Sequence, residues 1–264
     1  MIYHHDLNPV AFSVGHIPVS WYWLVYLLGY FFILHRGKRI LRLTPSLGLP
    51  AERFSRHMLW SWYGLFLGSR LWYVAFYHPK YFMEYPNQIY QFWNGGMSFH
   101  GALVGITAAL FFSTRKHRGD FWTSADLIAL SIPLVLAAGR VTNFLNGELA
   151  GRPTDGTWGV VFPRYVDDSP RHPSQLYQAL TEGILLFALL QIKSIKRLSA
   201  RGSIACFFIT GYGLMRFFTE FFRQPDPQIG FLALGLSVGQ LYCALMVLSG
   251  VWLYRKLRVQ HVSS

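Results

Sequence analysis

Residues 17–34 read IPVSWYWLVYLLGYFFIL, a run without a charged side chain, and this stretch decides the class of fold. The hydrocarbon core of a bilayer is about 30 Å thick and is crossed by roughly 20 helical residues. The stretch therefore predicts a membrane-spanning helix over residues 17–35. The residues before it contain no basic segment followed by a compact apolar run and a small-residue cleavage site, so we do not expect a cleaved signal peptide.

Six further apolar stretches follow along the chain, at residues 57–78, 94–114, 124–146, 174–193, 202–222 and 228–254. Together with the first, they predict an all-α polytopic membrane protein with seven transmembrane helices in one domain, 1–264. The composition agrees, because 52% of the residues are hydrophobic and only 14% are charged, whereas soluble proteins carry about 25% charged residues. This balance excludes a disordered chain, a coiled coil and an ordinary soluble enzyme.

The basic residues orient the predicted spans. Most lie after the first, third, fifth and seventh stretches, namely Arg36, Lys38, Arg39, Arg42, Arg53, Arg56, Arg115, Lys116, Arg118, Lys193, Lys196, Arg197, Arg201, Arg255, Lys256 and Arg258. Fewer lie in the alternate loops, namely Lys80, Arg152, Arg164, Arg171 and Arg223. The positive-inside rule then predicts an outer N-terminus and a cytoplasmic C-terminus. The net charge of +12 is explained by this topology and by anionic lipid, so no nucleic-acid partner is expected.

Ionisable residues inside three predicted spans lie at a similar depth. His100, Arg140 and Arg216 are each about 9 Å below the outer surface in this orientation. An unpaired arginine at the bilayer centre costs about 2.5 to 3.5 kcal/mol on the insertion scale. Such residues usually pair, face water or take part in chemistry. We therefore predict a shared polar chamber that opens outward, with Tyr22 near its rim.

In two of these spans, further polar residues lie at helical spacing from the arginine and so share its face of the helix. Asn143 follows Arg140 on one helical face, and Glu220 and Arg223 follow Arg216 on another. Arg216 and Glu220 could equally form a purely structural ion pair.

Other membrane-embedded residues have more than one interpretation. Arg70 could pair with Glu182 or extend its charge to the interface, and His100 could be an ordinary hydrogen-bonded histidine. Gly101 and Gly105 have the small-residue spacing that permits close helix contact.

No metal or cofactor motif is present. His4 and His5 are adjacent but have no third ligand nearby in the sequence, and Cys206 and Cys243 both lie in apolar runs. The two cysteines are predicted to be core residues.

Five segments together carry a family resemblance. They are SWYWLVYLLGY (20–30), GGMSFHG (95–101), AAGRVTNFLNGELAGRPT (137–154), RHPSQLY (171–177) and RFFTEFFRQPD (216–226). In this order, over nearly the whole chain, they resemble the prolipoprotein diacylglyceryl transferase family.

The resemblance implies a bacterial inner-membrane enzyme with seven spans and a small periplasmic head. We expect the long outer loop, residues 146–173, to contribute to that head. Such enzymes transfer the diacylglyceryl group of phosphatidylglycerol to the lipobox cysteine of a prolipoprotein signal peptide. The transfer forms a thioether, releases glycerol phosphate, and is the first step of lipoprotein maturation.

The resemblance also implies roles for individual residues. The expected catalytic residues are His100, Arg140, Arg216, Asn143 and Glu148, and the expected substrate-binding residues are Arg140, Arg216, Tyr22, Gly151 and Glu220. Three positions depart from the family pattern: Trp23 and Thr142 stand where glycine is common, and Gln178 stands where glutamate is common.

The expected chemistry suits these residue types. A thiolate would attack the terminal glyceryl carbon, and a histidine is a suitable base because a free thiol has a pKa near 8.5. Arginines would hold the phosphate, since the guanidinium donates bidentately and stays charged. A proton- or anion-coupled transporter, a phospholipid hydrolase and a purely structural membrane protein are the alternatives. Internal repeats are absent, as are a serine nucleophile elbow and a metal motif, which disfavours the first two.

Overall fold

The computed structural model describes residues 1–92, 95–165, 167–192, 200–224 and 236–262. The protein is mostly helical, which confirms the helical prediction, and it divides into two compact units. Unit 1 comprises Met1–Ile33 and Ala125–Ser264, and unit 2 comprises Leu34–Ser124. The start of the predicted span 228–254 and the basic segment after residue 192 lie outside the described residues.

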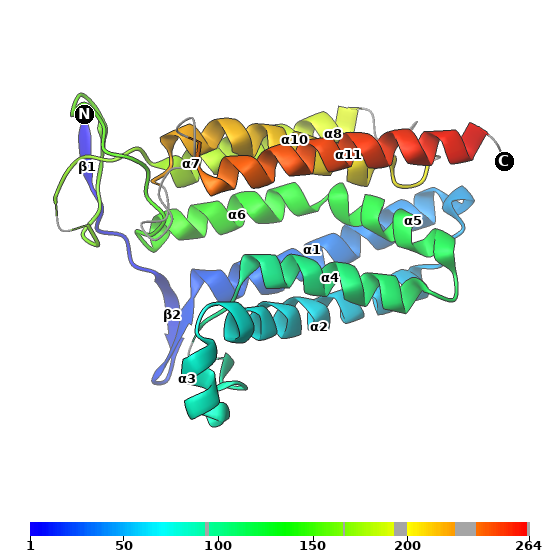
Figure 1. Cartoon of the computed structure of the whole chain (residues 1–264), viewed down its shortest axis with the longest axis horizontal. Coiled ribbons are helices and arrows are strands. Elements are labelled where there is room, and N and C mark those ends of the chain that lie inside the picture. The colour runs from blue at the N-terminus through cyan, green and yellow to red at the C-terminus, as the bar shows by residue number, and fades with distance from the viewer. Residues whose placement is uncertain (93–94, 166, 193–199, 225–235, 263–264) are drawn as a thin grey trace. The chain divides into compact units, whose positions relative to one another are not determined.

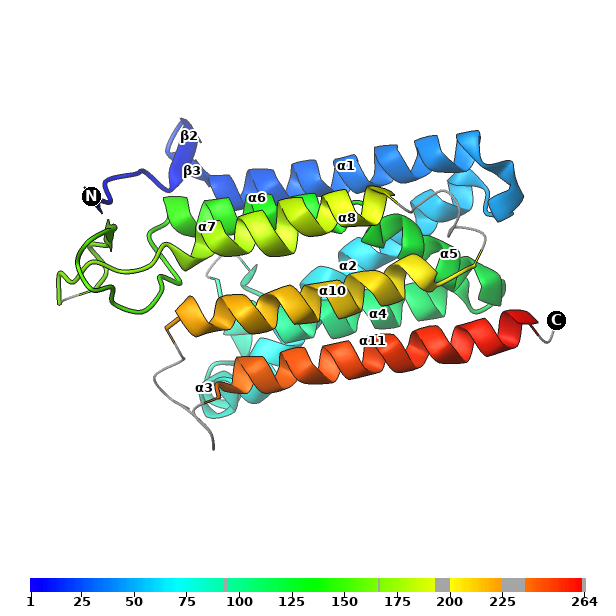
Figure 2. The ribbon, with the colours of Figure 1, turned by 90° about the horizontal axis from the view of Figure 1, so that it is seen from above.

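Unit 1 contains parallel and antiparallel helices that lie side by side, as Figures 1 and 2 both show. Its main elements are α6 (Ile132–Leu145), α7 (Ser174–Gln178), η4 (Ala179–Leu185), α8 (Leu186–Ile192), α10 (Ser203–Thr219), η5 (Glu220–Phe222) and α11 (Val238–Val262). Elements α7, η4 and α8 form one continuous helical stretch with a π-helical middle. The first part of α1 (Trp21–Leu43) also belongs to this unit.

The predicted stretch 124–146 is not one continuous helix. It is divided between α5 (Arg118–Ala129) and α6, which are bent by 46° at a short break. Pro133 lies in the first turn of α6. Proline has no backbone N–H and clashes with the preceding turn, so a helix starts at such a residue more easily than it passes through.

A buried carboxylate fixes the start of α10. Asp126 is 1% exposed, and its two oxygens accept hydrogen bonds from the N–H groups of Gly202 (2.7 Å) and Ala205 (2.8 Å). These N–H groups belong to the first turn region of α10, where no intrahelical acceptor exists. Asp126 therefore acts as a tertiary cap for the helix that carries Arg216.

Unit 2 is built around the contact between two helices. Its elements after α1 are η1 (Pro45–Leu47), α2 (Ala51–Phe76), α3 (Pro79–Glu84), η2 (Pro86–Gln88) and α4 (Phe99–Thr114). Gly64 and Gly68 on α2 face Gly101 and Gly105 on α4, and a Cβ on any of the four would overlap the facing backbone. The predicted close contact through Gly101 and Gly105 is confirmed, and α2 is the partner.

Arg70 of unit 2 is a structural residue whose partners are backbone carbonyls. It is 4% exposed, and its guanidinium donates to the carbonyl oxygens of Gln88 (2.5 Å), Ile89 (2.8 Å), Gly95 (2.5 Å) and Gly96 (3.1 Å). These acceptors lie at the end of η2 and in the loop between η2 and α4. Arg70 thus orders a loop, because one planar guanidinium satisfies several carbonyls at once.

Helix length and composition alone single out few membrane spans. Among the described helices, Ser174–Ile192 is long and apolar enough to cross a bilayer, and the bent pair of α5 and α6 is a second if counted as one span. The predicted stretch 17–35 begins before the helix does. Ile17–Ser20 form strand β3, which pairs antiparallel with β2 (Val10–Val14), and α1 begins at Trp21. Seven spans therefore stay a prediction.

The long loop after α6 folds together with the N-terminus of the chain. Strand β1 (Ile2–His4) pairs in parallel with β4 (Gly159–Val161). The buried His5 ring packs against Phe144 and Phe162, and its Nε2 lies 2.7 Å from the Phe144 carbonyl oxygen. His5 is thus a structural residue of a small compact cluster, which the sequence did not reveal.

Candidate active site

Two of the predicted arginines meet at one glutamate. Arg140 Nη2 of α6 lies 3.8 Å from Glu182 Oε2 of η4, and Arg216 Nη1 of α10 lies 3.4 Å from Glu182 Oε1. The side chains of Arg140, Arg216 and Glu182 are 21%, 10% and 1% exposed, respectively. A glutamate from one helix therefore joins arginines from two others, and Arg140 is the more accessible of the two cations.

Small residues let the helices approach closely enough for this contact. Gly183 of η4 faces Ala137 of α6, and a Cβ at Gly183 would overlap the alanine. Arg140 follows Ala137 by one helical turn, which directs it toward Glu182 beside Gly183. The π-helical turns of η4 are of a kind found often at functional sites.

Arg216 has a second acidic partner. Its Nη2 lies 2.7 Å from Glu220 Oε2, one turn later, and Arg223 Nη1 lies 3.7 Å from Glu220 Oε1. Hydroxyl groups complete the arrangement: Thr219 donates to Glu182 (2.7 Å), and Ser237 donates to Glu220 (3.3 Å). Arg216 is therefore held rigidly from two sides, as a buried cation requires.

A second polar group gathers around Asn143, on the same helix as Arg140. The Asn143 side-chain amide donates to the hydroxyl of Tyr22 and to Glu148 Oε1 (3.0 Å). Asn146 also donates to Glu148 (3.2 Å), and Arg164 lies 3.5 Å from the other carboxylate oxygen. The structure thus brings together Tyr22, Asn143 and Glu148, three residues to which the family resemblance gives a role.

Gly151 lies where three backbone segments cross. Its N–H donates to the carbonyl of His172 (2.9 Å), and the next residue, Arg152, donates to the carbonyl of Phe222 (2.9 Å). A Cβ at position 151 would lie 2.5 Å from both carbonyl oxygens. Only glycine fits, so Gly151 joins the loop after α6 to the start of α7 and to the end of η5.

The loop also contains an arginine whose role the sequence left open. Arg171 Nη2 donates to Asp167 (2.6 Å), and its guanidinium stacks 4.2 Å from the centre of the Tyr165 ring. The Ser169 hydroxyl, and then Arg171, hold the pKa of Asp167 below its ordinary value. Arg171 therefore orders this part of the loop after α6.

His100 lies in the first turn of α4, in unit 2, whereas the other predicted site residues lie in unit 1. Its side chain is outside the described part of the structure. The base role of His100 stays a prediction.

The three departures from the family pattern have different surroundings. Trp23 is 53% exposed on α1, and Gln178 is 2% exposed at the end of α7. The Thr142 hydroxyl donates to the carbonyl of Ala138 on its own helix (3.0 Å). The Thr142 side chain is thus satisfied within α6 next to Asn143.

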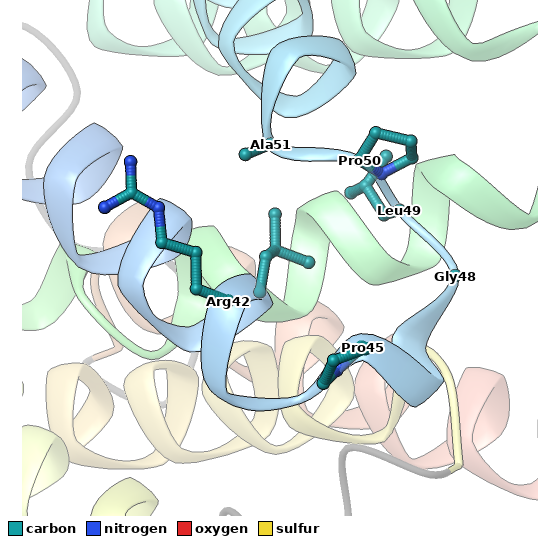
Figure 3. A pocket seen from close by; sticks show the side chains of 7 residues that line it. Arg42, Pro45, Gly48, Leu49, Pro50 and Ala51 are labelled. Carbon is teal, nitrogen blue, oxygen red and sulfur yellow. The ribbon is translucent and has the colours of Figure 1, made fainter.

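Among the described residues, no group of three or more His, Cys, Asp or Glu residues could hold a metal, and Cys206 and Cys243 are both buried, as predicted, and free. A hollow of about 330 Å³ in unit 2 is lined by Leu41, Arg42, Pro45, Gly48, Leu49, Pro50 and Ala51. Figure 3 shows it from close by. This lining has one charged residue and no general acid or base.

Comparison with known proteins identifies the family. Residues 9–255 match the family described as prolipoprotein diacylglyceryl transferase. Proteins named phosphatidylglycerol–prolipoprotein diacylglyceryl transferase are similar over almost their whole length. The one from Bordetella parapertussis is 44% identical over 254 residues, 96% of this chain and 97% of the relative.

Two further relatives agree. The protein from Aromatoleum aromaticum is 44% identical over 261 residues, 98% of each chain. The one from Nitrosomonas europaea is 42% identical over 260 residues, 97% of this chain and 93% of the relative. The linked arginines of unit 1 thus lie in a chain that belongs to the prolipoprotein diacylglyceryl transferase family.

Proposed function

We propose that this chain is an integral membrane enzyme that transfers the diacylglyceryl group of phosphatidylglycerol to the lipobox cysteine of prolipoproteins. Family membership supports the activity. The observation that carries the proposal for this chain is the pair of arginines, Arg140 and Arg216, joined through Glu182. A largely buried site with two neighbouring guanidinium groups suits a lipid phosphate.

We further propose seven transmembrane helices, over the stretches predicted from the sequence, in the bacterial inner membrane. The distribution of Lys and Arg supports a periplasmic N-terminus and a cytoplasmic C-terminus. In this orientation Arg140 and Arg216 belong to the outer half of the membrane. Residues 146–173 would then be part of a periplasmic head, available to the signal peptide of the prolipoprotein.

The arginines bind and stabilise the phosphate. Arg216, held by Glu182 and Glu220, provides a fixed charge, and the more accessible Arg140 completes the contact. During transfer, the bond between the glyceryl carbon and the phosphate ester oxygen breaks, and its electron pair stays on that oxygen. Preorganised donors stabilise such developing charge more than water does.

His100 prepares the nucleophile. It takes the proton of the lipobox thiol, and the thiolate sulfur forms the new bond to the glyceryl carbon. The proton then leaves with the glycerol phosphate or passes to water, so the products are a thioether and glycerol phosphate. Asn143 and Glu148 orient the site, and Tyr22 binds near the lipid headgroup, as their contacts with one another suggest. No cofactor takes part in this scheme.

The test is mass spectrometry of a lipobox peptide incubated with purified protein and phosphatidylglycerol. A gain of one diacylglyceryl group on the cysteine, with release of glycerol phosphate, is expected. Phosphatidylcholine in place of phosphatidylglycerol serves as the control lipid. Release of free diacylglycerol without peptide modification would instead indicate a hydrolase and would contradict the proposal.

A further inference from the structure

Glu182 lies in an unusual place for a residue near an anion-binding site. Its carboxylate is 1% exposed and lies between the two arginines expected to bind a phosphate. The Thr219 hydroxyl donates to Oε1 (2.7 Å), which fixes the carboxylate there. A negative charge beside both cations weakens their attraction for any anion.

The two phosphates of the proposed reaction differ in charge. Phosphatidylglycerol is a phosphodiester with one negative charge. The released glycerol phosphate is a phosphomonoester, which is largely dianionic above its second pKa of about 6. Without Glu182, the two arginines would be balanced by Glu220 alone. They would then bind the product more tightly than the substrate headgroup, and release would be slow.

We propose that Glu182 sets the charge preference of the site: it lets the arginines hold the monoanionic headgroup while disfavouring the dianionic product. This inference rests on the proposed function. Repulsion by the Glu182 carboxylate grows in proportion to the charge of the ligand, so it acts about twice as strongly on the dianion. Glu182 is thus a specificity-determining residue that works through Arg140 and Arg216.

The expected size of the effect follows from Coulomb's law. For a phosphate about 6 Å from the carboxylate and an effective dielectric constant of about 40, one charge changes anion affinity by about tenfold for each unit of ligand charge. Removal of the Glu182 charge should strengthen binding of a monoanion about tenfold and of a dianion about a hundredfold. The ratio of the two affinities should therefore change about tenfold.

The first test uses the wild-type protein and two soluble probes, glycerol phosphate and glycerophosphoglycerol. Both carry a phosphate esterified to glycerol, but only the former is a monoester; the latter has a second glycerol and is a diester. Calorimetric titration at pH 8 should give dissociation constants within about threefold of each other. A wild-type preference for glycerol phosphate of tenfold or more would overturn the proposal. This test needs the wild-type protein alone, so it does not depend on whether a variant folds.

Variants provide the second test. Glu182→Gln keeps an acceptor for Thr219 but loses the charge, and should shift the affinity ratio about tenfold toward glycerol phosphate. Glu182→Asp keeps the charge and should keep the wild-type ratio. Thr219→Val, a structural perturbation without charge change, should also keep it, as should the exposed control Glu84→Gln. An unchanged ratio in a folded Glu182→Gln protein would contradict the inference.

These measurements separate this inference from the proposed function. If the wild-type protein modifies the lipobox peptide but Glu182→Gln leaves the affinity ratio unchanged, only the role of Glu182 is wrong. If the wild type modifies no peptide and binds neither probe, the proposed function fails as well.

Discussion

Replacement of the two arginines by alanine should separate stability from activity. Arg216 is 10% exposed and pairs with both Glu182 and Glu220, so Arg216→Ala leaves two buried carboxylates poorly compensated. Breaking a buried ion pair from one side costs about 3 to 5 kcal/mol. Arg140 is 21% exposed and has one ion pair, at 3.8 Å. Its loss should cost about 1 kcal/mol or less.

The corresponding change in melting temperature is large enough to measure. In a chain of this size, 1 kcal/mol shifts the melting temperature by about 2 to 4 °C. Arg216→Ala should therefore melt about 10 °C below the wild type, and Arg140→Ala within about 3 °C of it. Both should lose transfer activity by about 100-fold or more, since each removes a donor that stabilises the leaving phosphate.

Thermal unfolding in detergent and the lipobox-peptide assay give the two quantities on the same samples. Arg115→Ala, an exposed arginine at the end of α4, is the matched control and should change neither. Equal loss of stability in Arg140→Ala and Arg216→Ala would refute the inference that the more buried arginine contributes more to stability. Full activity in well-folded Arg140→Ala would show that Arg140 does not bind the phosphate.

Three further changes test the supports of the site. Gly151→Ala should lower the free energy of unfolding by about 2 kcal/mol or more in thermal melts, because the new Cβ overlaps two carbonyl oxygens; unchanged melting would contradict this. Asp126→Asn should cost about 1 to 3 kcal/mol, since an amide cannot accept from both N–H groups at the start of α10, and a melt equal to the wild type would exclude the cap. Tyr22→Phe should raise the KM for phosphatidylglycerol by up to about tenfold with little change in melting; an unchanged KM would argue against headgroup contact.

Local spacing predicted part of the candidate site. Residues one helical turn apart face the same way, so the grouping of Arg216 with Glu220 followed from the sequence and is present as an ion pair. The close helix contact at Gly101 of α4 likewise followed from small-residue spacing, although its partner, α2, did not. These inferences depend only on helical geometry.

Long-range contacts were beyond the sequence. Glu182 joins Arg140 and Arg216 because Gly183 and Ala137 let two helices approach, and spacing along one helix carries no information about its neighbours. Strands of three residues such as β1 and β4 show no periodicity, so the pairing of the N-terminus with the loop after α6 was missed. The break before α6 had a local signal in Pro133, which is typical of a helix start.

The central claim is that Arg140 and Arg216 hold the phosphate of phosphatidylglycerol. Native mass spectrometry tests it directly, on protein released from membranes with equal amounts of phosphatidylglycerol and phosphatidylcholine. The wild type should retain phosphatidylglycerol preferentially, and folded Arg140→Ala should lose that preference while Arg115→Ala keeps it. Equal retention of both lipids by the wild type, or an unchanged preference in Arg140→Ala, would contradict the account.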